Sequence, residues 1–132
     1  HPLNAKLNIL VPVNGNEYSR RAAEVAIAVA RASHAPLTAL YVAPGGKKRS
    51  RRYEEAILKD ISKLAETYDT EVRTEVRADV AAEDAILKEL SRKPYSLVVI
   101  GAGRRPGEKL FFVDIAAALL EKSERSLLFI AS

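Results

Sequence analysis

Three glycines, Gly101, Gly103 and Gly107, lie between an apolar stretch and an apolar helical stretch, as in many loops that bind phosphate. Residues 96–102 read SLVVIGA and predict a buried strand, and the glycines have the spacing G-x-G-x3-G. Free N–H groups and the dipole at the start of a following helix attract anions. The spacing matches neither G-x-G-x-x-G nor G-x4-G-K-[ST]. A strand-to-helix turn without a ligand therefore stays open beside phosphate binding.

Val113 and Asp114, at the expected start of the last helix, argue against a bound triphosphate. The Asp114 carboxylate can accept the N–H groups that a phosphate would otherwise use. A carboxylate–phosphate charge pair at ~4 Å costs roughly 4 kcal/mol at an effective dielectric of about 20. The β-branched Val113 also blocks the close backbone approach that glycine permits. We therefore predict a self-capped helix with a degenerate triphosphate site, whereas a smaller ligand such as AMP stays possible.

Two basic clusters are expected on the same rim of the fold. Arg104 and Arg105 follow the second glycine, and arginine forks suit phosphate, so they either hold an anion or are solvated. The stretch from Lys47 to Arg52 reads KKRSRR, with five basic side chains of six. A solvated loop is the favoured interpretation, and contact with an anionic ligand or an anionic lipid surface is the functional alternative. No aromatic platform lies nearby, so we expect no nucleic-acid partner.

No constellation of residues predicts catalysis or a metal site. Cysteine is absent, which excludes thiolate chemistry. His34 ends the first predicted helix without Cys, His or acidic neighbours at ligand spacing, so it is interpreted as a helix cap. The sequence contains no G-x-S-x-G elbow. The pairs Glu54–Glu55 and Glu83–Asp84 are interpreted as exposed helix faces, and no enzymatic activity is expected.

The elements that must position these residues alternate between strand and helix. Helical spacing of apolar residues predicts four helices between the strands. This order predicts an α/β fold, a three-layer α/β/α sandwich around a five-stranded parallel sheet with Rossmann-like winding. Ligands on such sheets bind beyond the carboxyl ends of the strands. The predicted strands are residues 7–13, 35–43, 70–76, 96–102 and 126–131.

The composition of the strands also predicts their places in the sheet. Residues 7–13 and 96–102 are the most continuously apolar, so we place them in the centre. Residues 70–76 alternate, with valine and threonine on one face and charged side chains on the other, which indicates a half-buried edge strand. Pro12 lacks a ladder donor and is taken to mark where the first strand leaves the sheet. Asp79 is expected to cap the third helix.

Length and composition bound the class of protein. The chain has 132 residues, a net charge of +4 and 48% apolar residues, as expected of a single globular domain. We assign residues 7–132 to that domain and residues 1–6 to an N-terminal extension or tag remnant. No run reaches the ~18 apolar residues of a membrane span. Methionine is absent, which predicts a domain cut from a longer protein.

The stretches ILVPVNGNEYSRRAAEVAIAVA (9–30), ADVAAEDAIL (78–87), SLVVIGA (96–102) and SLLFIA (126–131) resemble the universal stress protein family. The resemblance covers nearly the whole chain. It implies the strand order 3-2-1-4-5 and dimers formed through the last strand. SLLFIA also lacks the proline or lysine that protects an exposed edge, so we expect a homodimer through Ser126 to Ala131.

Many members of that family bind ATP through an acidic residue after the first strand, a valine near the end of the second, and a loop reading G-x2-G-x9-G-[ST]. In this chain the acidic position holds Asn14, the valine is Val42 and the first glycine is Gly101. The second glycine is replaced by an arginine, and the closing pair by valine and aspartate. The resemblance therefore implies no required cofactor, with ATP or AMP as possible ligands. The candidate site comprises Asn14, Val42, Gly101, Gly103, Arg104, Arg105, Val113 and Asp114.

The stretch RRPGEKLFFVDIAAALLEKS (104–123) resembles the stress-protein-type domain at the C-terminus of some bacterial monovalent cation/proton antiporters. That resemblance implies a non-enzymatic regulatory or sensor domain on the cytoplasmic tail of a host membrane transporter. The alternative interpretation is a functional adenine-nucleotide-binding universal stress protein.

Overall fold

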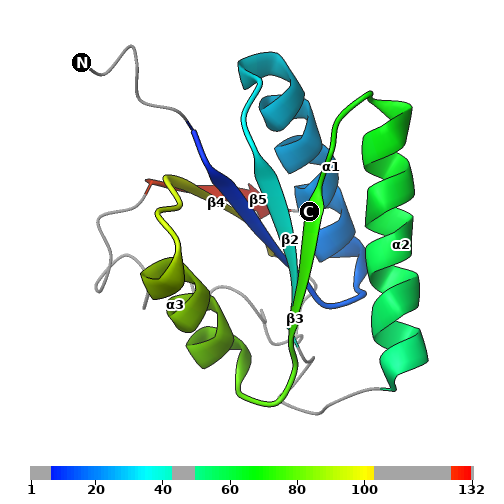
Figure 1. Cartoon of the computed structure of the whole chain (residues 1–132), viewed down its shortest axis with the longest axis vertical. Coiled ribbons are helices and arrows are strands. Elements are labelled where there is room, and N and C mark those ends of the chain that lie inside the picture. The colour runs from blue at the N-terminus through cyan, green and yellow to red at the C-terminus, as the bar shows by residue number, and fades with distance from the viewer. Residues whose placement is uncertain (1–6, 43–49, 103–125, 132) are drawn as a thin grey trace.

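The computed structural model describes residues 7–42, 50–102 and 126–131. In these residues five parallel strands form one sheet in the order β3-β2-β1-β4-β5. Helices α1 and α2 cover one face of the sheet and α3 covers the other (Figure 1). The predicted α/β fold and strand order are confirmed. The elements are β1 (Ile9–Val13), α1 (Glu17–Ser33), β2 (Leu37–Val42), α2 (Arg51–Thr67), β3 (Arg73–Arg77), α3 (Ala82–Arg92), β4 (Leu97–Ala102) and β5 (Ser126–Ala131).

Strands β1 and β2 are buried along their whole length, which explains their continuous apolar sequences. Ile9 is in register with both neighbouring strands, opposite Leu37 on β2 and Leu97 on β4. The prediction that β1 leaves the sheet at Pro12 is wrong, because Pro12 stays in register with Leu40 of β2. The pairing of β1 with β4 covers only the first two residues of the strand, so the missing N–H of Pro12 is tolerated.

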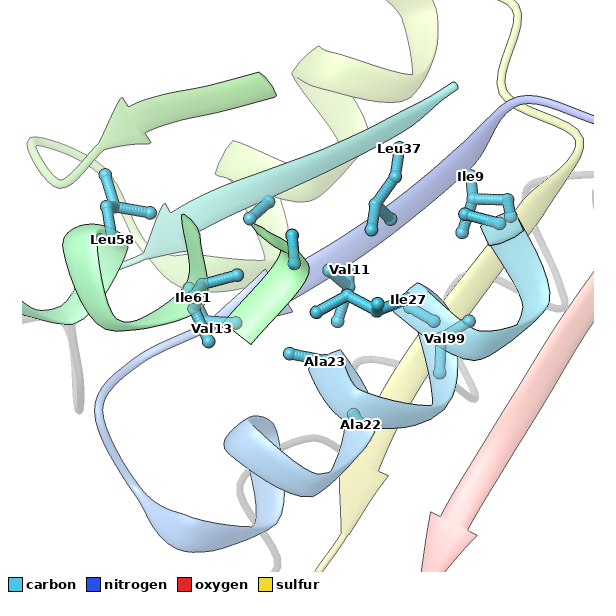
Figure 2. Packing of buried hydrophobic residues seen from close by; sticks show 14 of the residues in the cluster. Ile9, Val11, Val13, Ala22, Ala23, Ile27, Leu37, Leu58, Ile61 and Val99 are labelled. Atoms are coloured by element: carbon cyan, nitrogen blue, oxygen red, sulfur yellow. The ribbon is translucent and has the colours of Figure 1, made fainter. Parts of the chain in front are cut away.

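The core on the α1 and α2 face is built from alternate residues of the strands and one stripe of each helix. Ile9, Val11 and Val13 of β1 point to this face, toward Ile27 of α1 and Ile61 of α2 (Figure 2). The buried stripe of α1 consists largely of small side chains, which let the helix approach the sheet closely. The alanines of this stripe are Ala22, Ala23, Ala26 and Ala30.

Local hydrogen bonds fix the ends of the helices. Asn16 caps α1 by accepting from the Ser19 N–H at 2.8 Å, and His34 ends the helix in a left-handed conformation at φ 54°, which confirms the predicted cap. The expectation for α3 is wrong, because its N-cap is Ala81 rather than Asp79 and makes no side-chain cap bond. The first turn of α3 is acidic instead, which suits the helix dipole.

Strand β3 lies at the edge of the sheet, as predicted, but its valine and threonine face is not covered. Thr74 is exposed and Val76 is 46% exposed. The reason is that α2 packs against α1 and β2 rather than over β3. Glu75 and Arg77 alternate with these residues and form ion pairs with helix α3. Glu75 pairs with Arg92, and Arg77 pairs with Glu89. A cleft therefore opens between α2 and β3.

Candidate functional site

Three of the predicted site residues meet at one edge of the sheet. Asn14 directly follows β1, Val42 ends β2 and Gly101 is the penultimate residue of β4. The three strands are parallel and adjacent, so their carboxyl ends lie together (Figure 1). The remaining predicted residues, Gly103, Arg104, Arg105, Val113 and Asp114, lie outside the described residues, as do residues 47–49 of the basic stretch.

Asn14 is buried, at 4% exposure, and its carboxamide oxygen is used within the turn that follows β1. Its Oδ1 accepts from the backbone N–H of Asn16 at 3.0 Å. The Ser19 hydroxyl lies 3.2 Å from the same oxygen, and the Asn14 backbone N–H donates to that hydroxyl at 3.3 Å. An amide oxygen has two lone pairs. One is therefore used by the Asn16 N–H, and the other lies beside the Ser19 hydroxyl, whose single proton is shared with the Asn16 carbonyl at 3.0 Å.

The turn itself is tightly covered by α2. Gly15 has φ 95°, in the region that favours glycine, and a Cβ placed on it would collide with the hydroxyl of Tyr53. The ring of Tyr53 meets that of Tyr41 edge to face, with 6.3 Å between centroids. The turn after β1 is thus fixed both by its own hydrogen bonds and by the first turn of α2.

Gly101 is needed because another backbone approaches it closely. A Cβ on Gly101 would overlap the carbonyl oxygen of Tyr18 and crowd the N–H of Ser19, both in the first turn of α1. The described part of the chain thus gives a packing reason for this glycine. Sequence reasoning assigned it to a ligand loop or a turn and missed the contact, since Tyr18 is distant in the chain.

Val42 is fully buried and its side chain belongs to the hydrophobic cluster on the α3 face. That cluster also contains Leu40 and Ile86. The side chain of Val42 therefore packs in the core and helps to shape the edge of the sheet.

The sequence profile described as "Universal stress protein family" matches residues 7–131. The chain belongs to the universal stress protein family. No curated protein matches its sequence.

Solved structures of this family share the fold. A universal stress protein from Burkholderia pseudomallei superposes with a TM-score of 0.74 at 19% identity, covering 94% of this chain and 95% of that one. One from Archaeoglobus fulgidus in complex with dAMP gives 0.69 at 19%, covering 94% and 97%. One from Arabidopsis thaliana with AMP bound gives 0.61 at 15%, covering 95% and 91%. At these identities the likeness shows the fold alone.

Two further features of this universal stress protein domain concern membranes and metals. No helix within the described ranges has the length and apolar character that crossing a bilayer requires. Within the same ranges, no three His, Cys, Asp or Glu side chains come together as metal ligands would.

Sequence reasoning missed a buried carboxylate network on the α3 face of the stress-protein fold. Glu89 of α3 is fully buried, and its Oε2 accepts from the Tyr95 hydroxyl at 2.6 Å. Arg92 contacts both of its oxygens, at 3.1 Å each, and the Arg77 Nε lies 3.5 Å from Oε1. The network therefore joins α3 to edge strand β3 and to the segment before β4.

The network shifts the pKa values of its members in opposite directions. Burial alone would raise the pKa of Glu89, but hydrogen bonds from Tyr95 and Arg92, with the charge of Arg92, outweigh it and lower that pKa. Burial, and then the hydrogen bond to Glu89, raises the pKa of Tyr95 to about 12. Glu89 is thus held as a carboxylate and Tyr95 as a neutral phenol.

The prediction that Glu54 lies on an exposed face is wrong, although Glu55 is exposed as expected. Glu54 is 5% exposed, and no donor among the described residues lies within hydrogen-bonding distance of its Oε2. A helical period was the signal that could have found it. Glu54 lies on the stripe of α2 that buries Leu58, Ile61 and Ala65.

Proposed function

We propose that this chain is a non-enzymatic regulatory domain of the universal stress protein type whose carboxyl edge does not hold a triphosphate. The observation that supports this most is the engagement of Asn14 Oδ1 by the Asn16 N–H and the Ser19 hydroxyl. The family's ATP-binding pattern has an acidic residue at this position. This oxygen is buried and held within the turn, so it is poorly placed to accept from a ligand hydroxyl.

The described residues offer little for catalysis at this edge. The Ser19 hydroxyl is directed into the turn, with Asn14 Oδ1 at 3.2 Å and the Asn16 carbonyl at 3.0 Å. His34, which caps the far end of α1, is the histidine of the described ranges. A nucleophile needs a base within about 2.6–3.2 Å. This arrangement supports a domain that binds or signals rather than one that reacts.

Binding of an adenine mononucleotide is the second candidate function. Two structural neighbours of this fold were solved with dAMP and with AMP. A monophosphate does not occupy the positions that hold a β- or γ-phosphate. The presence of Val113 and Asp114 in place of the family's glycine and serine is therefore a weaker argument against AMP than against ATP. The meeting of Asn14, Val42 and Gly101 at one edge favours the same place.

The test is to release and identify any nucleotide from the purified native protein, and then to titrate it calorimetrically with Mg-ATP and with AMP. We expect no ATP to be released and no heat of binding with Mg-ATP. The triple variant with Asn14→Asp, Val113→Gly and Asp114→Ser restores the acidic residue and the closing pair of the family pattern and is expected to gain ATP binding. Stoichiometric ATP in the native protein would overturn the proposal, and binding of AMP alone would establish the second candidate.

The setting of the domain is a further part of the proposal. We propose that it acts as the cytoplasmic tail of a cation/proton antiporter and dimerises through β5, Ser126–Ala131. The position of β5 at the end of the strand order supports the second point. Light scattering on the purified chain tests the dimer, with Leu128→Pro as the variant that removes a donor from the strand. A monomeric wild type would overturn it.

A further inference from the structure

The cleft between α2 and β3 is separate from the carboxyl edge of β1 and β4. It has a volume of about 980 Å³. Strand β2 and strand β1 lie between β3 and β4, so neither Asn14 nor Gly101 lines this cleft. We name it the α2–β3 cleft. Its lining residues are Ser50, Arg51, Glu54, Glu55, Leu58, Thr74, Val76, Arg77, Ala78 and Asp79.

Glu54 gives the cleft its chemical character. Glu54 is only 5% exposed to solvent, and its Oε2 has no hydrogen-bond donor in the part of the chain that the structure describes. A buried polar atom without a partner is rare and costly, and more so when it carries charge. An incoming donor would therefore gain a full charge-assisted hydrogen bond here.

The charges around Glu54 favour a cation. Glu55 and Asp79 add two more carboxylates to the lining, against the guanidinium groups of Arg51 and Arg77. The Nε of Arg77 is directed to Glu89 on the other face of the sheet, at 3.5 Å. Among the described lining residues, three carboxylates stand against two arginines, which is an excess of negative charge.

The apolar residues in the walls of the cleft favour a cation that carries an aliphatic chain. Leu58, Val76 and Ala78 provide apolar surface beside the carboxylates. An aliphatic chain packs on such surface, whereas a hydrated metal ion gains nothing from it. The described residues also hold no metal-ligand cluster.

We propose that the α2–β3 cleft binds an aliphatic ammonium compound, with one –NH3⁺ group donating to Glu54 Oε2 and the hydrocarbon chain lying along Val76 and Leu58. This site does not depend on the function proposed for the carboxyl edge.

Calorimetric titration of the purified chain with putrescine tests the site, with butanediol as the neutral probe of similar shape. We expect saturable binding of putrescine near millimolar or better, about −4 kcal/mol as converted from that Kd, and none of butanediol. Glu54→Gln keeps the side-chain shape and removes the charge, so it is expected to weaken binding at least about tenfold. Glu66→Gln, at an exposed position of the same helix that does not line the cleft, is the matched control and is expected to change Kd less than about threefold.

A second variant tests the cleft without touching a buried residue. Val76→Lys introduces a competing ammonium group at a position that is 46% exposed, so the fold is retained while putrescine binding is lost. Absence of putrescine binding to the wild type, equal binding of butanediol, or unchanged binding by Glu54→Gln would each overturn the proposal. AMP and ATP titrations of the same variants report on the carboxyl edge separately.

Discussion

Glu89 and Glu54 are both buried glutamates on helices, yet their surroundings are opposite. Glu89 receives hydrogen bonds from Tyr95 and Arg92 and an ion pair from Arg77. Glu54 has one oxygen with no donor among the described residues, and it lines an open cleft. A satisfied buried carboxylate fixes elements together, and an unsatisfied one is a place where a ligand can gain binding energy. The comparison indicates that Glu89 has a structural role, whereas Glu54 belongs to a candidate binding site.

The largest expected effect is at Glu89. Glu89→Ala leaves the buried Tyr95 hydroxyl without its acceptor and opens a cavity, so we expect a loss of about 2–4 kcal/mol in the free energy of unfolding. Urea denaturation followed by circular dichroism measures it. Glu55→Gln, at an exposed position, serves as the control and should stay within about 0.5 kcal/mol of the wild type. If Glu89→Ala lowered the free energy of unfolding by less than about 1 kcal/mol, the proposed difference between a structural Glu89 and a ligand-binding Glu54 would be contradicted.

A smaller loss is expected at Tyr95. Tyr95→Phe removes one hydrogen bond to a charged group, which contributes roughly 1.5–3 kcal/mol. The wild type should also lose stability as the pH rises from 10.0 to about 12, because the folded pKa of Tyr95 lies above its ordinary value and the unfolded state releases the proton first. Denaturant titrations across that range should show the decline in the wild type and a flatter profile in Tyr95→Phe.

Acid should also weaken the Glu89 network. The folded pKa of Glu89 lies below its ordinary value of 4.5, so its contribution is complete above that pH and is lost as the pH falls through the folded pKa. Unfolding free energies of the wild type and Glu89→Gln should therefore converge at low pH. A constant difference between the two proteins from neutral to acid conditions would contradict the assignment.

The smallest effect on stability is expected at Glu54. Glu54→Gln removes a buried charge whose Oε2 lacks a donor within the described ranges, so without ligand the protein should be unchanged or up to about 1 kcal/mol more stable. The melting temperature and a urea titration, measured without amine, check this. Destabilisation by more than about 2 kcal/mol would mean that Glu54 holds the fold, as Glu89 does.

The sequence predicted most of the fold because apolar periodicity reports which face of an element is buried. The strand order, the edge position of β3 and the His34 cap are all confirmed. Of the candidate site, Asn14, Val42 and Gly101 are placed together, and the other predicted residues lie outside the described ranges. Pro12 and Asp79 were misread, because a proline is tolerated beside a short ladder and a helix can begin without a side-chain cap.

The sequence by itself determined the order of elements and the parallel sheet, because local propensity and apolar spacing act over a few residues. The tertiary structure alone decided that Gly101 meets the backbone of Tyr18 and that a cleft stays open beside the buried Glu54. Both outcomes depend on where α1 and α2 settle on the sheet. The helical period places Glu54 on the buried stripe of α2, but it carries no signal of what covers that stripe beside β3.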